Sequence, residues 1–163
     1  MNADVAAAIR WLENKGLTSD RLILYGYGIG SAPVVEIAAN PRTLSPAKII
    51  LEAPIASIEL LLQDALYQSV PADFFTGLKF NNADKIQNVT QPLLWFHGGQ
   101  DDIYPVEHGQ LVFDSHPGVE GTQKLGFRIK NADHDNIPAK ISPLESDSYN
   151  QYLLDIRTFF ENY

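Results

Sequence analysis

A glycine-rich turn between two contrasting segments constrains this chain most strongly. Residues 26–30 read Gly-Tyr-Gly-Ile-Gly, after an apolar run at residues 22–25 and before the helix-like run of residues 31–39. Apolar residues that run together without alternation predict a buried strand. The sequence therefore predicts a strand that begins at Arg21 and ends at Tyr25, then a tight turn, then a helix that ends near Asn40.

Further strands and helices follow the same alternation along the 163 residues. Asp4 is the expected N-cap of a first helix, and Gly16 the residue that follows its last turn. Three more strands are predicted, at residues 48–52, 92–97 and 124–130, and an amphipathic helix over 149–160. Alternating strands and helices predict one α/β domain, residues 1–163, with about four strands in a mostly parallel sheet and helices on both faces.

The connection between the second and third strands is longer than one crossover helix requires. Residues 58–67 have a helical pattern, and Phe74, Phe75 and Phe80 follow in a looser region. We expect residues 55–91 to form a cap-like insertion. Its aromatic side chains serve either ordinary packing or the lining of an apolar substrate pocket.

Composition excludes several classes of function. A net charge of −8 argues against nucleic-acid binding, which requires clustered Lys and Arg. The chain has no cysteine for disulfides or thiolate sites and no apolar run of roughly 18 residues. No basic segment with an apolar core opens the sequence, so we expect a cytoplasmic rather than a secreted protein. No cofactor is expected.

The glycine turn has two interpretations. In the first it is a dinucleotide-binding fingerprint, G-x-G-x-x-G, with Ser31 at the sixth position and Glu52 as the ribose-binding acid about 20 residues further on. Against this, a full helix precedes the strand, and the later polar clusters have no assigned role. In the second interpretation, the turn is a G-x-S-x-G nucleophile elbow whose central serine is replaced by Gly28.

The polar clusters favour the elbow. In a hydrolase triad of this kind the order along the chain is Ser, then Asp or Glu, then His, each in a loop after a strand. Asp101 follows the third predicted strand, and His134 follows the fourth. Their order, spacing and position in loops agree with the acid and base of such a triad.

Together with the segment Leu-Glu-Ala-Pro at residues 51–54, these motifs resemble the α/β-hydrolase superfamily. The branch with serine esterases, depalmitoylases and prolyl-oligopeptidase-like enzymes is the most similar, with segments of the form G-x-S-x-G-S, L-E-S-P, H-G-x-x-D-x-x-x-P and G-x-x-H. The resemblance covers nearly the whole chain, but only the C-terminal half of that fold.

The resemblance implies roles for four positions. Gly28 occupies the nucleophile position, Asp101 is the acid, His134 is the base, and the backbone N–H of Ile29 is an oxyanion donor. Asp102 is an alternative acid. The assignment requires the imidazole of His134 to lie within about 10 Å of the turn.

Other polar residues have simpler interpretations. Ser31 is expected to cap the helix that follows the turn. His97 is expected to be structural, and His108 and His116 are expected in a surface helix and at its end, with no partner suggested by the sequence. Asp133 and Asp135 flank His134 and, with Asp101, offer oxygen ligands for a cation, but the spacing matches no known loop, so no metal site is expected.

Without a side chain at position 28 no acyl-enzyme can form, so the sequence predicts a catalytically inactive hydrolase-fold domain. One alternative is a fragment or variant of an active serine hydrolase that acts on esters, thioesters or peptide bonds and so binds an acyl substrate. A dinucleotide-binding, Rossmann-like domain is the second alternative.

The resemblance also implies that half of the fold is missing. The second oxyanion donor comes from the loop after an earlier strand, which this chain lacks, and the complete fold has about twice as many strands. The strand from Arg21 to Tyr25 would then have one unpaired edge. We expect this edge to pair with a missing N-terminal half or with a second chain.

Overall fold

The computed structural model describes residues 2–66, 80–142 and 145–163. Its centre is a parallel sheet of four strands in the order β1-β2-β3-β4. The strands are β1 (Ile23–Tyr27), β2 (Lys48–Glu52), β3 (Leu93–Gly98) and β4 (Lys124–Ile129). Because the spatial order follows the chain order, each strand joins its neighbour through a crossover that contains a helix. The predicted four-stranded parallel α/β sheet is confirmed.

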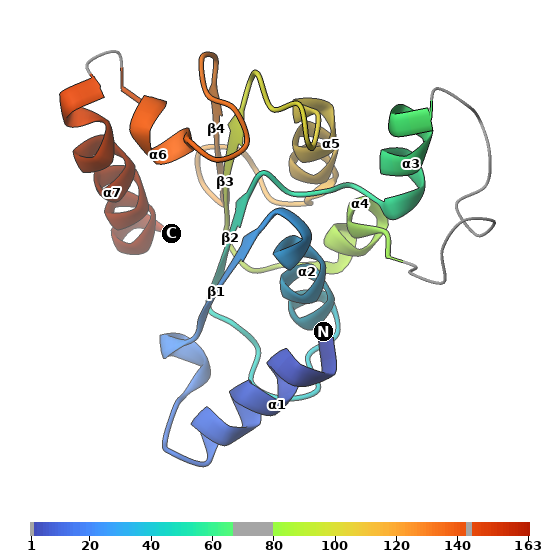
Figure 1. Cartoon of the computed structure of the whole chain (residues 1–163). Helices are drawn as coiled ribbons and strands as arrows, with labels where there is room; N and C mark the ends of the chain where they lie inside the picture. The colour runs from blue at the N-terminus through green and yellow to red at the C-terminus, as the bar shows by residue number, and fades with distance from the viewer. Residues whose placement is uncertain (1, 67–79, 143–144) are drawn as a thin grey trace.

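Helices cover both faces of the sheet. Figure 1 shows α6 and α7 on one side of the strands and α2, α4 and α5 on the other. The helices are α1 (Asn2–Glu13), α2 (Ser31–Ala39), α3 (Ile58–Leu66), α4 (Asn82–Lys85), α5 (Val106–Ser115), α6 (Ile137–Lys140) and α7 (Glu145–Asn162). Short 3₁₀ turns lie at Ser19–Arg21, Gly28–Gly30 and Ile86–Asn88.

Each face has its own apolar core. On the α2 and α5 side, Val35 and Ile49 are fully buried and pack in one cluster with residues of β3. On the other side, Phe96 of β3 and Phe159 of α7 are fully buried in a second cluster. Burying each such side chain contributes about 1.5–3 kcal/mol to stability. The two cores therefore hold the strands in place, and with them the polar loops that follow the strand ends.

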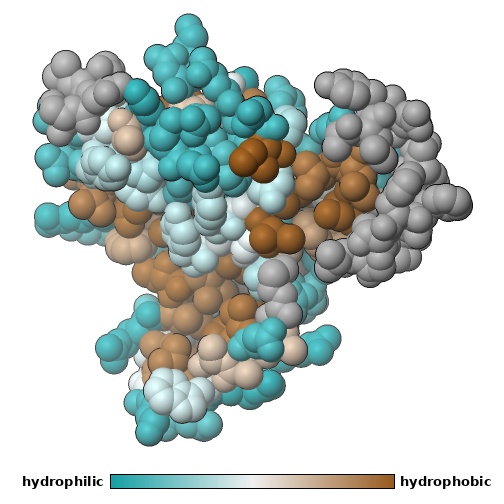
Figure 2. Space-filling view, viewed as in Figure 1, coloured by the Kyte–Doolittle hydropathy of each residue, from teal (hydrophilic) through white to brown (hydrophobic). Residues whose placement is uncertain are grey.

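The first strand differs from its prediction in position and burial. β1 begins two residues later than expected, and Ile23, Tyr25 and Tyr27 are 37%, 49% and 39% exposed. The prediction of a fully buried strand is therefore wrong. β1 lies at the edge of the sheet, and its outer face is only partly covered. Figure 2 shows apolar side chains gathered in this region, between α7 and α1.

The first helix was predicted from about Val5 to Lys15, but it begins at Asn2 and ends at Glu13; Gly16 follows its last turn as predicted. The N–H groups of Gly16 and Leu17 donate to the carbonyls of Glu13 and Leu12, which is a Schellman motif, and Gly16 has a φ of +92°. Asp4, however, lies in the first turn of α1 rather than at its N-cap, so that prediction is wrong.

The long connection between β2 and β3 contains α3 and α4. The cap-like insertion over residues 55–91 stays a prediction. Two of its aromatic residues, Phe74 and Phe75, lie outside the described residues.

Candidate active site

Gly28 lies where β1 ends and the helical turn before α2 begins. Its φ is +53°, in the left-handed region that a side chain rarely adopts. A Cβ atom at Gly28 would lie 3.6 Å from Nε2 of His134 and 3.1 Å from Cε2 of Tyr104. The imidazole of His134 is thus next to the turn, well within the distance that the sequence assignment requires.

The neighbouring glycines are not equivalent to Gly28. A Cβ at Gly26 would lie 2.7 Å from the carbonyl oxygen of Gly30, so the tight turn needs glycine there. A Cβ at Gly30 would meet nothing within 4 Å. Gly30 therefore offers a matched control for substitutions at Gly28.

Asp101 and His134 form a buried pair. Nδ1 of His134 lies 2.8 Å from Oδ2 of Asp101, and both residues are 7% exposed. The other carboxylate oxygen, Oδ1, accepts the backbone N–H groups of Ile103 and Tyr104 at 3.0 and 2.8 Å. Asp102 is exposed. The structure thus brings Gly28, Asp101 and His134 together, while their catalytic roles stay predictions.

The electrostatics of Asp101 fix the proton on His134. Burial by itself raises the pKa of Asp101, but contacts from His97, the Tyr104 N–H and His134 hold that pKa below its ordinary value. Asp101 is therefore a carboxylate at neutral pH, and the neutral imidazole carries its proton on Nδ1. The lone pair on Nε2 then faces Gly28.

Two tyrosines hold the imidazole from different sides. The ring centroids of Tyr27 and Tyr104 each lie 4.9 Å from that of His134, and the Tyr104 ring meets it edge-on at 84°. The Tyr27 hydroxyl donates to Oδ1 of Asp135 at 2.5 Å and to the carbonyl of His134 at 3.3 Å. Burial and then the hydrogen bond to Asp135 raise the pKa of Tyr27, which keeps it a neutral donor.

Sequence reasoning missed both tyrosines. The sequence feature that could have pointed to them is their position near predicted site residues: Tyr27 precedes Gly28, and Tyr104 follows Asp101 by three residues.

Ser31 does not cap the helix that it begins. Its Oγ accepts the Ile55 N–H at 3.4 Å and an amide N–H of Asn82 at 3.1 Å, and the residue is fully buried. The capping prediction is therefore wrong, because Ser31 links α2 to the loop after β2 and to α4.

Two histidines that were expected on the surface are buried. His108 is fully buried on α5, where Nδ1 accepts the Ala56 N–H at 3.2 Å and Nε2 lies 2.9 Å from Oδ2 of Asp64. His116 is 3% exposed, and its Nε2 lies 3.0 Å from the Gln91 carbonyl. The expectation of surface positions is wrong, because both side chains are buried and have polar partners in the fold.

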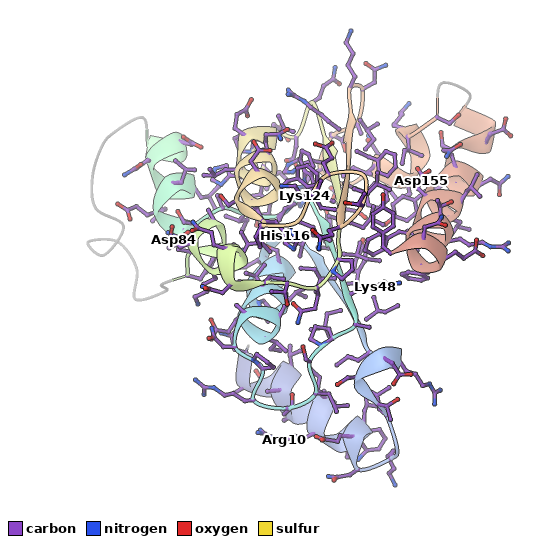
Figure 3. All side chains as sticks on the ribbon, turned by 180° about the vertical axis from the view of Figure 1, so that it is seen from behind. Arg10, Lys48, Asp84, His116, Lys124 and Asp155 are labelled. Carbon is purple, nitrogen blue, oxygen red and sulfur yellow. The ribbon has the colours of Figure 1, made fainter. Side chains whose placement is uncertain are left out.

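Lys124 lies beside His116 (Figure 3) and donates to its carbonyl at 3.0 Å. Burial lowers the pKa of His116, its hydrogen bond to Gln91 opposes this, and Lys124 lowers it further. His116 is therefore a neutral structural residue. His97 is also fully buried, with Nε2 2.9 Å from the Tyr104 carbonyl and 3.4 Å from Oδ2 of Asp101.

Glu52 forms hydrogen bonds within the protein. Its carboxylate is buried and accepts the hydroxyls of Tyr25 and Tyr152, each at 2.5 Å. The acid required by the dinucleotide interpretation is thus bonded to side chains of the protein itself.

The surroundings of His134 are acidic. It lines a pocket of about 350 Å³ together with Asp102, Asp133 and Asp135. Among the described residues, no group of three or more His, Cys, Asp or Glu side chains is arranged to hold a metal ion. In the same part of the chain, no helix is both long and apolar enough to cross a bilayer.

Comparison with known proteins gives consistent neighbours. No family model matches the chain. It is 28% identical over 161 residues to the α/β hydrolase domain-containing protein 17C of Xenopus tropicalis, covering 98% of this chain and 45% of that protein. It is 32% identical over 113 residues to the human α/β hydrolase domain-containing protein 17B, covering 69% of this chain and 36% of that protein.

Among solved structures, the esterase domain of a Rhodothermus marinus protein has the same fold, with a TM-score of 0.63 at 18% identity. That match covers 98% of this chain and 68% of the esterase domain. The chain thus spans less than half the length of the curated relatives that it matches.

Proposed function

Because the chain belongs to the α/β-hydrolase superfamily, we propose that it is a hydrolase-fold domain that binds a ligand without forming an acyl-enzyme. The observation that carries this proposal is Gly28, which places a backbone without a side chain next to Nε2 of His134. The acid and the base of a triad are present, and the atom that they would activate is absent.

The chemistry of acyl transfer explains why this loss is decisive. In a serine triad the hydroxyl oxygen attacks the acyl carbonyl, the imidazole accepts its proton, and the carboxylate orients the imidazole. Ser31 does not replace the missing oxygen, because its Oγ is buried and bonded to Ile55 and Asn82. Removing a triad member leaves only about 10³–10⁴-fold catalysis over water.

Of the two donors that an oxyanion site needs, one can be assigned among the described residues. The N–H of Ile29 corresponds to the donor that follows the nucleophile, whereas the second donor belongs to a loop after an earlier strand. The described part of the chain has no strand before β1. Because position 28 has no nucleophile, an ester, thioester or amide would be held at this site without efficient cleavage.

A fluorophosphonate probe tests the proposal, because it reacts with activated serines. The wild-type chain should remain unlabelled, as judged by intact mass. Gly28→Ser should be labelled on the new serine, about 10²-fold faster than the double variant that also carries His134→Ala, which lacks the general base. Gly30→Ser adds the same side chain outside contact distance of other groups and should not be labelled. Labelling of any serine in the wild type would overturn the proposal.

The intact pair of Asp101 and His134 supports a second candidate, in which the parent protein is an active serine hydrolase and Gly28 is a variant. The relevant test is Gly28→Ser in a protein extended to the length of the relatives. It should hydrolyse a carboxylic ester or a thioester. A folded but inert revertant would count against this candidate.

A further inference from the structure

β4 lies at the edge of the sheet opposite to β1 (Figure 1), and no described strand pairs with its outer side. The carbonyl groups of Gln123 and Ile129 accept N–H groups from β3 and from the glycine that follows it, so odd-numbered residues along β4 face β3. Backbone groups alternate sides along a strand. The N–H and C=O groups of Lys124, Gly126 and Arg128 therefore point away from the sheet.

A loop of the same chain covers only the beginning of this edge. The Lys124 N–H donates to the Val119 carbonyl at 3.2 Å, and the Lys124 carbonyl accepts the Gly121 N–H at 2.8 Å. Beyond this loop, no described residue bonds to the outward backbone groups of Gly126 and Arg128. An extended peptide can pair with such groups as an added strand, which is the recognition mode called β-augmentation.

The same stretch of β4 lines a basic pocket. Residues 126–131 and 140–142 line about 590 Å³ and include Arg128, Lys130 and Lys140, and none of these described lining residues is acidic. Arg128 and Lys130 are exposed and form no ion pair with any described carboxylate. The chain as a whole has a net charge of −8. An acidic group is therefore attracted to this pocket, whereas most of the remaining surface repels it.

The two faces of β4 define the pattern of residues that a partner needs. Arg128 and Phe127 are successive residues of the strand, so their side chains point to opposite faces. Phe127 stacks on Phe96, and Ile141 packs against the same apolar cluster. Phe127 and Ile141 also line the pocket. A strand added beside β4 would direct alternate residues towards Arg128 and towards these apolar side chains, so alternating acidic and apolar residues fit this surface.

A second copy of this chain is a poor occupant of this edge. Antiparallel pairing of two β4 strands would bring Arg128 and Lys130 of one copy beside the same cations of the other. Like charges on neighbouring strands destabilise their pairing, and charged side chains on edge strands prevent self-association. The cations thus disfavour a second copy and favour an acidic partner.

We propose that the outer edge of β4 binds an extended segment of another protein in which acidic and apolar residues alternate. The backbone groups of Gly126 and Arg128 pair with this segment, while the side chains of Arg128 and Lys130 bind its carboxylates. Because the pocket contains no residue of the candidate active site, binding here goes beyond the proposed function and does not depend on it.

Fluorescence anisotropy with the wild-type chain tests the pattern and the charge. A fluorescein-labelled peptide of three Glu-Val repeats should bind saturably, and its affinity should fall at least about threefold between about 0.05 and 0.5 M salt. A block peptide of the same composition, Glu-Glu-Glu-Val-Val-Val, should bind at least about fivefold more weakly, because its carboxylates point to both faces. Three Lys-Val repeats should not bind. The absence of saturable binding, or equal affinities for the alternating and block peptides, would overturn the proposal.

Amide hydrogen exchange tests the place of binding, again without a variant. Saturating Glu-Val peptide should slow exchange at Gly126 and Arg128 at least about tenfold. The amides of Leu125 and Phe127, which face β3, should not change. Protection of Gly126 and Arg128 that grows with protein concentration in the absence of peptide would assign the edge to a second copy and would overturn the proposal.

Charge variants test the side chains. Arg128→Glu combined with Lys130→Glu should weaken binding of the Glu-Val peptide at least about tenfold. The matched control, Arg21→Glu combined with Arg42→Glu, makes the same change in net charge at exposed positions outside the pocket and should keep the affinity within about threefold. Equal losses in the two double variants would reduce the effect to net charge and contradict a site at β4.

A proline variant tests the backbone pairing. Arg128→Ala removes the charge alone, whereas Arg128→Pro also removes the outward N–H without breaking a bond to β3. The proline variant should therefore bind the Glu-Val peptide at least about threefold more weakly than the alanine variant. Equal affinities of these two variants would rule out an added strand and overturn the proposal.

Discussion

Asp101 forms hydrogen bonds with the imidazole of His134 and with backbone N–H groups of its own loop. Its ionisation should therefore change the free energy of unfolding. Its pKa in the folded protein lies below the ordinary value, so its contribution is present above about pH 4 and is lost as the pH falls through the folded value. Asp101→Asn should lower the free energy of unfolding at pH 7 by about 1.5–3 kcal/mol, the value of hydrogen bonds to a charged group. Urea titrations from pH 7 to pH 3 should show this difference shrinking below pH 4.

Asp102→Asn is the matched control for this experiment. Asp102 is adjacent but exposed, so its substitution should change stability by less than about 0.5 kcal/mol at any pH. A loss for Asp101→Asn that is equal at pH 3 and pH 7 would contradict the charge argument and leave only an effect of packing.

The two tyrosines that donate hydrogen bonds to Glu52 should affect stability at alkaline pH, in contrast to Asp101, whose effect is lost at acidic pH. Burial, and then the hydrogen bond to Glu52, raise the pKa of Tyr25 and of Tyr152. A group with a raised pKa stabilises the fold below its unfolded value, about pH 10, and this contribution is lost as the pH rises towards the folded value. Tyr152→Phe should therefore cost about 1.5–3 kcal/mol at pH 8 and make stability less dependent on pH above 10.

Tyr149→Phe on the same helix is the comparison, because Tyr149 is 63% exposed. Its free energy of unfolding, measured from pH 8 to pH 11.5, should follow that of the wild type. If Tyr152→Phe lost stability with pH as steeply as the wild type, the phenol would not be the titrating group.

The end of α1 shows how one residue terminates an element. Gly16 has a φ of +92°, and a Cβ there would meet nothing within 4 Å, so Gly16→Ala is opposed by backbone conformation alone. We expect it to lower the thermodynamic stability by about 1–2 kcal/mol. Gly30→Ala also meets nothing and has a φ of −63°, so it should be neutral or stabilising. Equal effects of the two substitutions in chemical denaturation would contradict this.

The elements were predictable where local pattern determines them. β2 and α2 have the expected bounds because each is a short apolar segment between turn residues. β1 was misplaced because a continuous apolar run does not reveal which face of a strand is covered. That depends on α7, which lies more than a hundred residues further along the chain.

The candidate site was predictable to a similar extent. Asp101 and His134 follow β3 and β4 at recognisable spacing, and the parallel sheet brings them together at the carboxyl ends of these strands. The partners of Glu52 and His108 were not predictable, because Tyr152 and Asp64 are 100 and 44 residues away in the sequence. No local pattern encodes such contacts, so the sequence does not distinguish a buried, hydrogen-bonded Glu52 or His108 from an exposed one.

At the scale of the whole molecule, no described strand pairs with the outer edge of β1. The Leu22 carbonyl accepts the Ala47 N–H beside β2, and backbone groups alternate sides along a strand. Ile23, Tyr25 and Tyr27 therefore direct their N–H and C=O groups to the open edge. Because the match leaves about a third of the Rhodothermus marinus esterase domain uncovered, we propose that a further segment of the fold or a second chain pairs with this edge.

Hydrogen exchange can test this open edge residue by residue. In dilute protein, the amides of Ile23, Tyr25 and Tyr27 should exchange at least about tenfold faster than those of Leu24 and Gly26, which face β2. Protection of the first three that grows with protein concentration would indicate that a second copy covers the edge. Ile23→Lys, which places a charge on this exposed strand, should then reverse that protection without changing the amides of β3. Uniform protection along β1 at high dilution would contradict an open edge, and with it the argument that this sheet requires a further strand.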